Sequence, residues 1–317
     1  MGNRVFEKLS DPPLLQRSPM LIFAADPLAA VGLHGLGREM TPHLHYRTRL
    51  EFLELLRKIT ADGYIDGLLM TPADAEVLAV DEHLFDVHPV TPIVRVNAET
   101  AIWNPRFGQY RRQQSYPLQT VPLSEAAYCD YSIDEAKACH IHLGLYSITL
   151  NNDVEADERT LNAYLRFARE VGETPDFDHI LEFFLPNVNL PGMDEKARGQ
   201  YVADSIVRTM SYLRRHQRPL FLKTVYTTPE TWRELTGFDL TLVIGALGGP
   251  RQNARKTLQL ACDATEHGGR VILFGRSIFE EDDPRLIVKY LRTVLDRTMT
   301  VDEAHGAYQR SLRTFNR

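Results

Sequence analysis

Apolar residues fall into eight short runs along the chain, and a stretch with helical spacing of apolar residues follows most of them. Short apolar runs are typical of buried strands, whereas apolar residues every three or four positions indicate amphipathic helices. The predicted strands cover residues 20–25, 64–70, 91–96, 140–148, 179–185, 219–226, 240–245 and 270–274.

Helix-start signals lie between these runs. Thr228 stands where an N-cap residue is expected, and Pro229 follows at the first helical position. Thr300 and Glu303 have the spacing of a capping box, which predicts a further helix over about 301–312. The other predicted helices cover residues 49–60, 155–171, 194–215, 252–267 and 283–295, with one more beginning at Pro72.

This alternation predicts a parallel sheet, because each helical crossover returns the chain to the same end of the sheet. Eight strand–helix units favour a closed (β/α)₈ TIM barrel over an open sheet. We expect residues 1–317 to form a single barrel domain. Residues 97–122 fit no such unit and are predicted to be an inserted loop, and the helix over 301–312 is an addition at the C-terminus.

Charge, hydropathy and the spacing of cysteines and histidines argue against several classes of function. The net charge is −6 and the isoelectric point is about 6.0, which gives no electrostatic reason to expect nucleic acid as a partner. No apolar stretch approaches the roughly 20 residues of a membrane-spanning helix. The three cysteines show no CxxC spacing and the histidines show no HExxH spacing, so we expect a cytoplasmic protein without a metal or other cofactor.

Lys223 is the most informative single residue. Only seven of the 36 basic residues are lysine, so a lysine within a buried strand is unusual for this chain. Burial disfavours the ammonium form of a lysine and favours the free amine, which is the nucleophile in Schiff-base chemistry. In a barrel of this type the active site lies at the C-terminal ends of the strands, where Lys223 is placed.

Other polar residues end, or lie within, neighbouring predicted strands. Glu182 pairs with Lys223 either as a structural ion pair or as a catalytic partner, and Asp26 either caps a turn or transfers protons. His142 and Tyr146 are candidate catalytic residues on the fourth strand, with packing as the alternative for each. Arg95 also lies at a strand end.

Glycines follow the seventh and eighth strands, where barrels of this type usually bind phosphate. Gly248, Gly249 and Gly275 allow backbone N–H groups to approach an anion, and Arg276 can add a bidentate contact. The alternative is a tight turn beside a surface arginine. Because these features occur at both loops, we expect a site for a phosphorylated small molecule.

Three segments in this order resemble the class I aldolases of the DeoC/LacD superfamily, especially the archaeal-type fructose-bisphosphate and the tagatose-bisphosphate aldolases. They are Leu222-Lys223-Thr224-Val225-Tyr226, Gly248-Gly249-Pro250 and Phe274-Gly275-Arg276-Ser277-Ile278-Phe279, and they span about 60 residues. The resemblance implies a metal-independent barrel enzyme, commonly oligomeric, whose lysine forms a Schiff base.

Individual residues also fit that resemblance. Lys223 matches the Schiff-base lysine, Glu182 resembles a fifth-strand carboxylate and Asp26 a first-strand aspartate. The tagatose-bisphosphate branch has a second lysine on the fourth strand, where His142 aligns here, and no other lysine of this chain falls at a predicted strand end.

We therefore expect an aldolase that cleaves or forms a C–C bond in a phosphorylated sugar or ketose, and a homo-oligomer. One alternative is a phosphosugar isomerase or epimerase that uses Glu182 as a base without covalent catalysis. Another is a catalytically inactive barrel that binds a phosphorylated metabolite.

Overall fold

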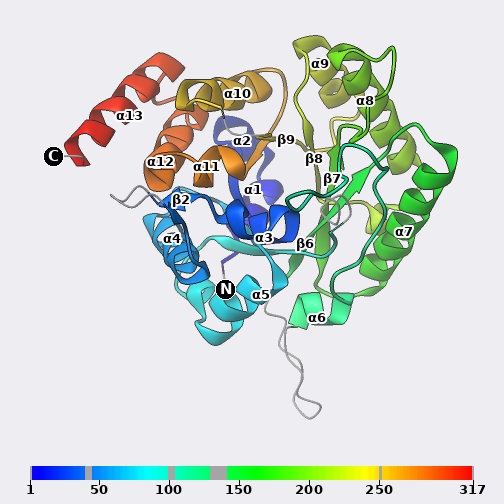
Figure 1. Cartoon of the computed structure of the whole chain (residues 1–317), viewed down its shortest axis with the longest axis horizontal. Coiled ribbons are helices and arrows are strands. Elements are labelled where there is room, and N and C mark those ends of the chain that lie inside the picture. Colours follow the sequence, from blue (N-terminus) through cyan, green and yellow to red (C-terminus); the bar gives the residue numbers. More distant parts are fainter. Residues whose placement is uncertain (1, 40–44, 99–103, 129–140, 250–251, 316–317) are drawn as a thin grey trace.

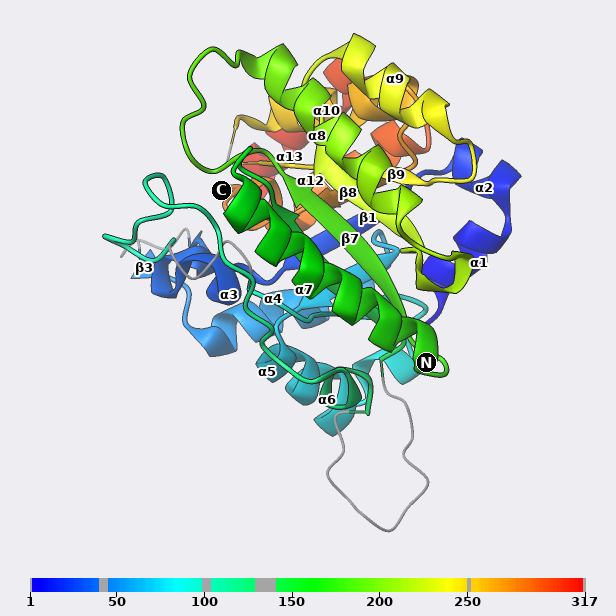
Figure 2. The same cartoon turned by 90° about the vertical axis from the view of Figure 1, so that its right-hand side faces the viewer.

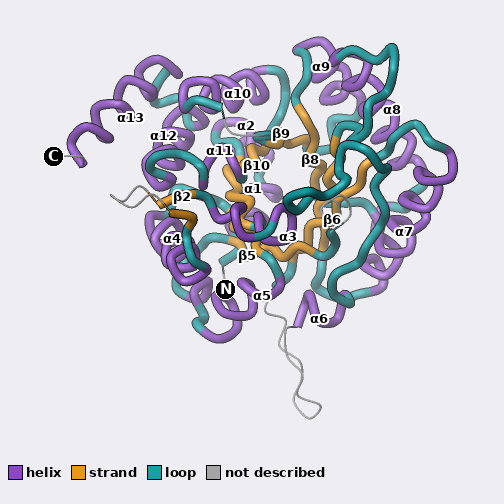
Figure 3. Tube along the Cα trace, viewed as in Figure 1, coloured by secondary structure: helices purple, strands orange, loops and turns teal. Residues whose placement is uncertain are grey.

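Eight parallel strands close into a barrel in the computed structural model, which confirms the predicted (β/α)₈ fold (Figures 1 and 3). The structure describes residues 2–39, 45–98, 104–128, 141–249 and 252–315. Each strand pairs with the strands before and after it in the barrel, and the first pairs with the last. The barrel strands are β1 (Met20–Ala25), β4 (Gly67–Met70), β5 (Thr91–Arg95), β6 (Leu143–Thr149), β7 (Asp178–Phe184), β8 (Phe221–Val225), β9 (Ile244–Leu247) and β10 (Val271–Phe274).

Helices surround the barrel, as Figure 1 shows, and α7 lies along its outside beside β7 (Figure 2). The predicted start at Thr228 is present, since its side chain accepts a hydrogen bond from the Thr231 backbone and Pro229 occupies the first turn. The helices are α1 (Arg4–Ser10), α2 (Pro12–Arg17), α3 (Pro27–Val31), α4 (Arg49–Asp62), α5 (Pro72–Ala75), α6 (Leu123–Tyr128), α7 (Val154–Glu173), α8 (Glu195–Ser211), α9 (Pro229–Phe238), α10 (Ala254–Glu266), α11 (Arg276–Phe279), α12 (Pro284–Leu295) and α13 (Val301–Phe315).

Two predicted strands are displaced in the structure. The seventh strand was predicted over 240–245, but β9 spans 244–247, because Asp239 accepts hydrogen bonds from the backbone and hydroxyl of Thr241 and so forms a turn there. The fourth strand was predicted over 140–148, whereas β6 spans 143–149. Both shifts move the C-terminal end of the strand, which decides the residues that reach the barrel mouth.

The segment predicted as an insertion connects β5 to α6. Its residues 99–103 lie outside the described residues, and residues 104–122 contain no helix or strand beyond a single bridge between Asn97 and Gln119. A short antiparallel pair, β2 (Arg38–Glu39) with β3 (His45–Tyr46), lies between α3 and α4. No helix in the described part of the chain is long and apolar enough to span a bilayer.

Alternate residues of the barrel strands point inward and fill the lower barrel with apolar side chains. Met20, Ile22, Ile93 and Leu145 belong to this inner cluster, and Val5 of α1 packs against it from the N-terminal end. A second apolar cluster lies between the strands and the outer helices. The barrel is thus closed at the bottom by apolar side chains, and a pocket opens at its C-terminal mouth.

A buried carboxylate at the bottom of the barrel connects α1, α12 and β1. Asp66 lies 3.0 Å from Lys8 Nζ and 3.1 Å from Arg292 Nη1, and it accepts a hydrogen bond from the Leu21 backbone. The exposed pair of Asp62 with Arg285 offers a matched comparison, since it has similar geometry but little burial of the arginine.

We predict that Asp66→Asn lowers the free energy of unfolding by about 3–5 kcal/mol, because it leaves the buried Lys8 without its carboxylate and removes one of the two carboxylates that pair with Arg292. The control, Asp62→Asn, should cost about 1 kcal/mol or less, since its ion pair is exposed to solvent. Urea unfolding at neutral pH measures both. Equal losses for the two variants would contradict this account of the barrel bottom.

Candidate active site

Lys223 lies at the barrel mouth in the same register as residues of the strands beside it. The ladder pairs Ser147 of β6 with Glu182 of β7, and Glu182 with Lys223 of β8. Lys223 Nζ is 2.6 Å from Glu182 Oε1, and both side chains are almost fully buried. Because these groups stand on rigid, adjacent strands, their relative position is fixed by backbone pairing and not by loop conformation.

Glu182 is held by three neighbours in addition to its strand. Ser147 Oγ donates a hydrogen bond to Glu182 Oε2 at 2.6 Å, and Arg95 Nη1 lies 3.7 Å from the same oxygen. Burial alone raises the pKa of Glu182, but Lys223 and Arg95 with the hydrogen bonds outweigh it and hold the pKa below its ordinary value of 4.5. Glu182 is therefore a carboxylate at neutral pH.

Arg95 links the two carboxylates of the site. Its Nη1 also donates to Asp26 Oδ2 at 2.8 Å, at the end of β1. The cluster therefore holds two cations, Lys223 and Arg95, with two anions, Glu182 and Asp26, and its charge balances. The resemblance had suggested His142 in place of a second lysine near the reactive one, and the second cation here is Arg95. An arginine stays protonated, so it stabilises negative charge but does not transfer protons.

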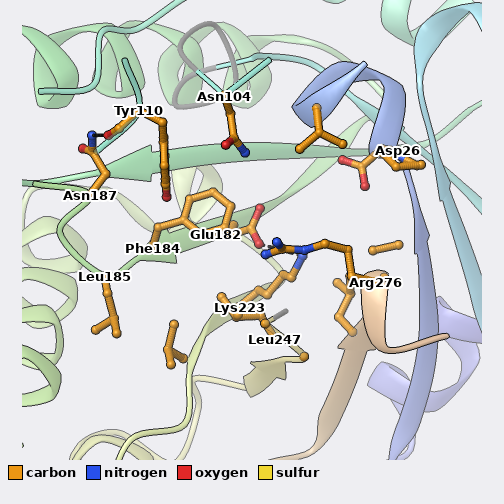
Figure 4. A pocket seen from close by; sticks show the side chains of 18 of the residues that line it. Asp26, Asn104, Tyr110, Glu182, Phe184, Leu185, Asn187, Lys223, Leu247 and Arg276 are labelled. Atoms are coloured by element: carbon orange, nitrogen blue, oxygen red, sulfur yellow. Dashed lines mark hydrogen bonds and ion pairs between the residues drawn. The ribbon is translucent and has the colours of Figure 1, made fainter. Parts of the chain in front are cut away.

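These residues line the floor of a cavity of about 680 Å³, which is within the usual size of a small-molecule site (Figure 4). The predicted phosphate residues Gly248, Gly249, Gly275 and Arg276 line it too. A Cβ on Gly248 would lie 2.3 Å from Ser277 Oγ, and Gly249 has a φ of +65°. Both positions thus require glycine, and the resulting close backbone approach leaves the pocket wall open to an anion.

Arg276 carries a positive charge into this pocket that is not paired with a carboxylate of the described residues. It begins α11, and no described carboxylate lies within ion-pair distance of its guanidinium. Pro250, the third residue of the predicted Gly-Gly-Pro turn, lies outside the described residues. An arginine without a described carboxylate partner, beside two glycine loops, is suited to binding phosphate.

The structure does not bring the other two predicted residues to the pocket. His142 precedes β6 at the N-terminal end of the barrel, where its Nδ1 lies 2.8 Å from the Asp176 carbonyl oxygen. Tyr146 points outward and stacks on Phe167 of α7, with ring centroids 4.6 Å apart. The assignment of His142 to the mouth was wrong because this residue lies at the start of the strand and not at its C-terminal end. Tyr146 has the opposite side-chain parity to Ser147.

Two residues of the cluster had no assigned role in the sequence analysis. Arg95 lay at a predicted strand end, so its position carried a signal. Ser147 gave none, because a serine within an apolar run is unremarkable until the β6–β7 register places it opposite Glu182. The Asn97 side chain then fixes the Ser147 backbone, because its Nδ2 donates to the Ser147 carbonyl and its Oδ1 accepts from the Ser147 N–H, each at 2.8 Å.

Comparison with solved structures shows which known proteins share this fold. An archaeal fructose 1,6-bisphosphate aldolase superposes with a TM-score of 0.63 over 89% of this chain and 95% of its own, at 14% identity. A fructose-bisphosphate aldolase from Slackia heliotrinireducens gives 0.67 over 96% and 91%, also at 14% identity. The chain shares its fold with these aldolases. The predicted resemblance is confirmed at the level of the fold.

Sequence comparison matches a shorter part of the chain than the structural comparison does. No family model matches the chain. A 3-hydroxy-5-phosphonooxypentane-2,4-dione thiolase from Shigella flexneri is 30% identical over 87 residues, which are 27% of this chain. The match spans about a third of the length of that relative, 33%.

We predict that Glu182→Gln lowers the free energy of unfolding by about 3–5 kcal/mol at neutral pH, because it leaves the buried Lys223 without its carboxylate. The folded-state pKa of Glu182 is depressed, so its contribution is complete above about pH 4.5 and declines as the pH falls further. Urea unfolding at pH 7 and below pH 4 measures the difference between wild type and variant.

The exposed Glu170 on α7 provides the control, and Glu170→Gln should change stability by no more than about 0.5 kcal/mol at either pH. If the effect of Glu182→Gln instead grew as the pH fell, the assigned direction of the Glu182 pKa shift would be wrong.

Proposed function

We propose that this protein is a class I aldolase that cleaves or forms a C–C bond in a phosphorylated sugar or ketose through a Schiff base on Lys223. The observation that carries the proposal is the buried contact of 2.6 Å between Lys223 Nζ and Glu182 Oε1 at the floor of the pocket. A strand-end lysine paired in this way has a built-in acceptor for the proton it must lose before it attacks a carbonyl.

Proton transfer within the pair prepares the nucleophile. The ammonium of Lys223 gives a proton to Glu182, and the free amine adds to the substrate carbonyl carbon to give a carbinolamine. Loss of its hydroxyl as water, with a proton returned by Glu182, leaves an iminium on Lys223. Glu182 can hold this proton while Lys223 is neutral, because burial disfavours a carboxylate that has lost its neighbouring cation.

The iminium then acts as an electron sink for the C–C bond. A base removes the proton from the hydroxyl beside the scissile bond, the bond breaks to release an aldehyde, and its electrons form an enamine on Lys223. Glu182 and Asp26 are the two carboxylates that line the pocket within its described part. Arg95 contacts both of them and keeps the pair in position.

The rim of the pocket supports a phosphorylated substrate. Gly248, Gly249, Gly275 and Arg276 would hold the phosphate and so orient the carbonyl toward Lys223. The name of the Shigella relative describes a phosphorylated dione, and the fold neighbours are named for a phosphorylated ketose. Both names describe carbonyl compounds that carry phosphate, in agreement with the proposed substrate class.

We predict that Lys223→Met abolishes turnover in an aldehyde-release assay with a panel of phosphorylated ketoses, because thioether sulfur cannot form an iminium. The exposed Lys256 of α10 provides the matched control, and Lys256→Met should retain wild-type turnover. Circular dichroism checks that both variants are folded.

Turnover retained in Lys223→Met would refute covalent catalysis and favour an isomerase or epimerase that uses Glu182 as its base. Ligand-induced thermal stabilisation of the wild type, without turnover of any substrate in the panel, would favour the inactive binding barrel.

A further inference from the structure

Three apolar side chains, the apolar layer of Phe184, Val225 and Leu247, lie between the reactive pair and the barrel mouth. Phe184 lies two positions beyond Glu182 on β7, and Val225 lies two positions beyond Lys223 on β8. Val225 pairs in turn with Leu247 of β9. Alternate residues of a strand share a face, so the apolar layer points into the barrel as the reactive pair does, and all three side chains line the cavity.

The protein covers the apolar layer only in part. The residues just before it on β7, β8 and β9 are buried, whereas Phe184, Val225 and Leu247 are half-buried. Their exposed surface faces the cavity that they line. Apolar surface left open in a pocket is stabilised when a ligand with apolar groups displaces water from it.

The apolar surface continues into the loop after β7. The residues of this loop that line the cavity include three with apolar side chains, Leu185, Pro186 and Val188. Figure 4 shows Phe184 and Leu247 on the side of Lys223, with Asp26 across the pocket. The pocket thus has a polar side, formed by Asp26 with Arg95, and an apolar side at β7, β8 and β9.

The first polar side chain after β7 is already engaged within the protein. Asn187 Nδ2 donates one hydrogen bond to the Tyr110 carbonyl and another, of 2.7 Å, to the Gln113 carbonyl. Its Oδ1 accepts a hydrogen bond of 2.8 Å from Asn151 Nδ2. A primary amide has two N–H donors, so the Asn187 side chain has no N–H left for a substrate hydroxyl.

The order of the strands determines which part of a substrate meets the apolar side. The proposed phosphate loops follow β9 and β10, and Lys223 stands on β8, which is followed around the barrel by β7. A substrate bound at both points directs the carbons beyond its carbonyl toward Phe184 and the loop after β7. Hydroxyl groups there would lose hydrogen bonds to water, whereas CH₂ groups gain from burial.

We propose that the aldehyde fragment of the substrate carries an apolar alkyl or aryl chain, and that Phe184 and Val225 determine this preference. The inference rests on the proposed function, which places the carbonyl at Lys223 and the phosphate at the glycine loops. In the cleavage step the hydroxyl proton passes to the base and the electrons of the C–C bond form the enamine on Lys223. The released product is then an alkanal or an aromatic aldehyde, without a further reactant.

Calorimetric titration with two non-reacting probes tests the apolar side. Hexyl phosphate and sorbitol 6-phosphate each have six carbons and one phosphate, but only the second has hydroxyl groups along its chain. The wild type should bind hexyl phosphate at least about tenfold more tightly. Phe184→Ala should weaken hexyl phosphate by about tenfold and leave sorbitol 6-phosphate unchanged.

Val225→Thr adds a hydroxyl with little change of shape, so it should weaken hexyl phosphate and strengthen sorbitol 6-phosphate. A merely structural role for either residue would weaken both probes alike. The matched controls are Phe238→Ala on α9 and Val154→Thr on α7, since both side chains are exposed and neither lines the cavity. Both controls should keep the wild-type preference.

Aldol addition to dihydroxyacetone phosphate tests the same preference during turnover. The acceptors are butanal, glyceraldehyde and glyceraldehyde 3-phosphate, the last because Arg111 and Arg198 also line the cavity. The kcat/KM should be highest for butanal, and Phe184→Ala should lower it for butanal alone, by about tenfold. A higher kcat/KM for either of the other aldehydes, or equal affinity of the wild type for the two titration probes, would overturn the inference.

The two experiments separate this inference from the proposed function. Addition through an adduct on Lys223, with glyceraldehyde or its phosphate preferred, would overturn the apolar aldehyde fragment and leave the aldolase proposal standing. A preference for hexyl phosphate that Phe184→Ala removes, without addition of any of the three aldehydes, would refute the aldolase proposal and support an apolar subsite beside Lys223.

Discussion

The buried pair of Lys223 and Glu182 is the interaction on which the rest of the site depends. Moving two charges out of water costs desolvation free energy. The attraction between the two charges offsets this cost only where further hydrogen bonds and charges satisfy both groups. Ser147 and Arg95 supply them here, and Asp26 balances Arg95 in turn. A cluster assembled from β1, β5, β6, β7 and β8 can hold its geometry only if the barrel is closed and in register.

Strands and loops contribute different parts of the proposed site. The strands hold the groups proposed to react, whose mutual distances must be fixed to within a fraction of an ångström. The loops after β9 and β10 present glycine backbone and Arg276 at one side of the mouth. The segment after β5 closes the opposite side, attached to the loops after β6 and β7 through Asn151 and Asn187. Changes in these loops would alter the substrate without disturbing the cluster.

Sequence reasoning succeeded where residues lie at clear strand ends. Lys223 and Glu182 were expected to meet because consecutive parallel strands are neighbours, and the observed register confirms that they are adjacent. It failed for His142, which was assigned to the barrel mouth although it lies just before the N-terminal end of β6. The pairing of Asn151 with Asn187 had no local signal, since the two residues are 36 positions apart and meet only in the folded chain.

Mass spectrometry of the protein after incubation with dihydroxyacetone phosphate and sodium borohydride tests the central claim most directly. Borohydride reduces an iminium to a stable secondary amine, so the account predicts one added substrate moiety per chain, located by peptide mapping on Lys223. Absence of an adduct with this probe and with a panel of phosphorylated ketoses, or an adduct on an exposed lysine in place of Lys223, would contradict it.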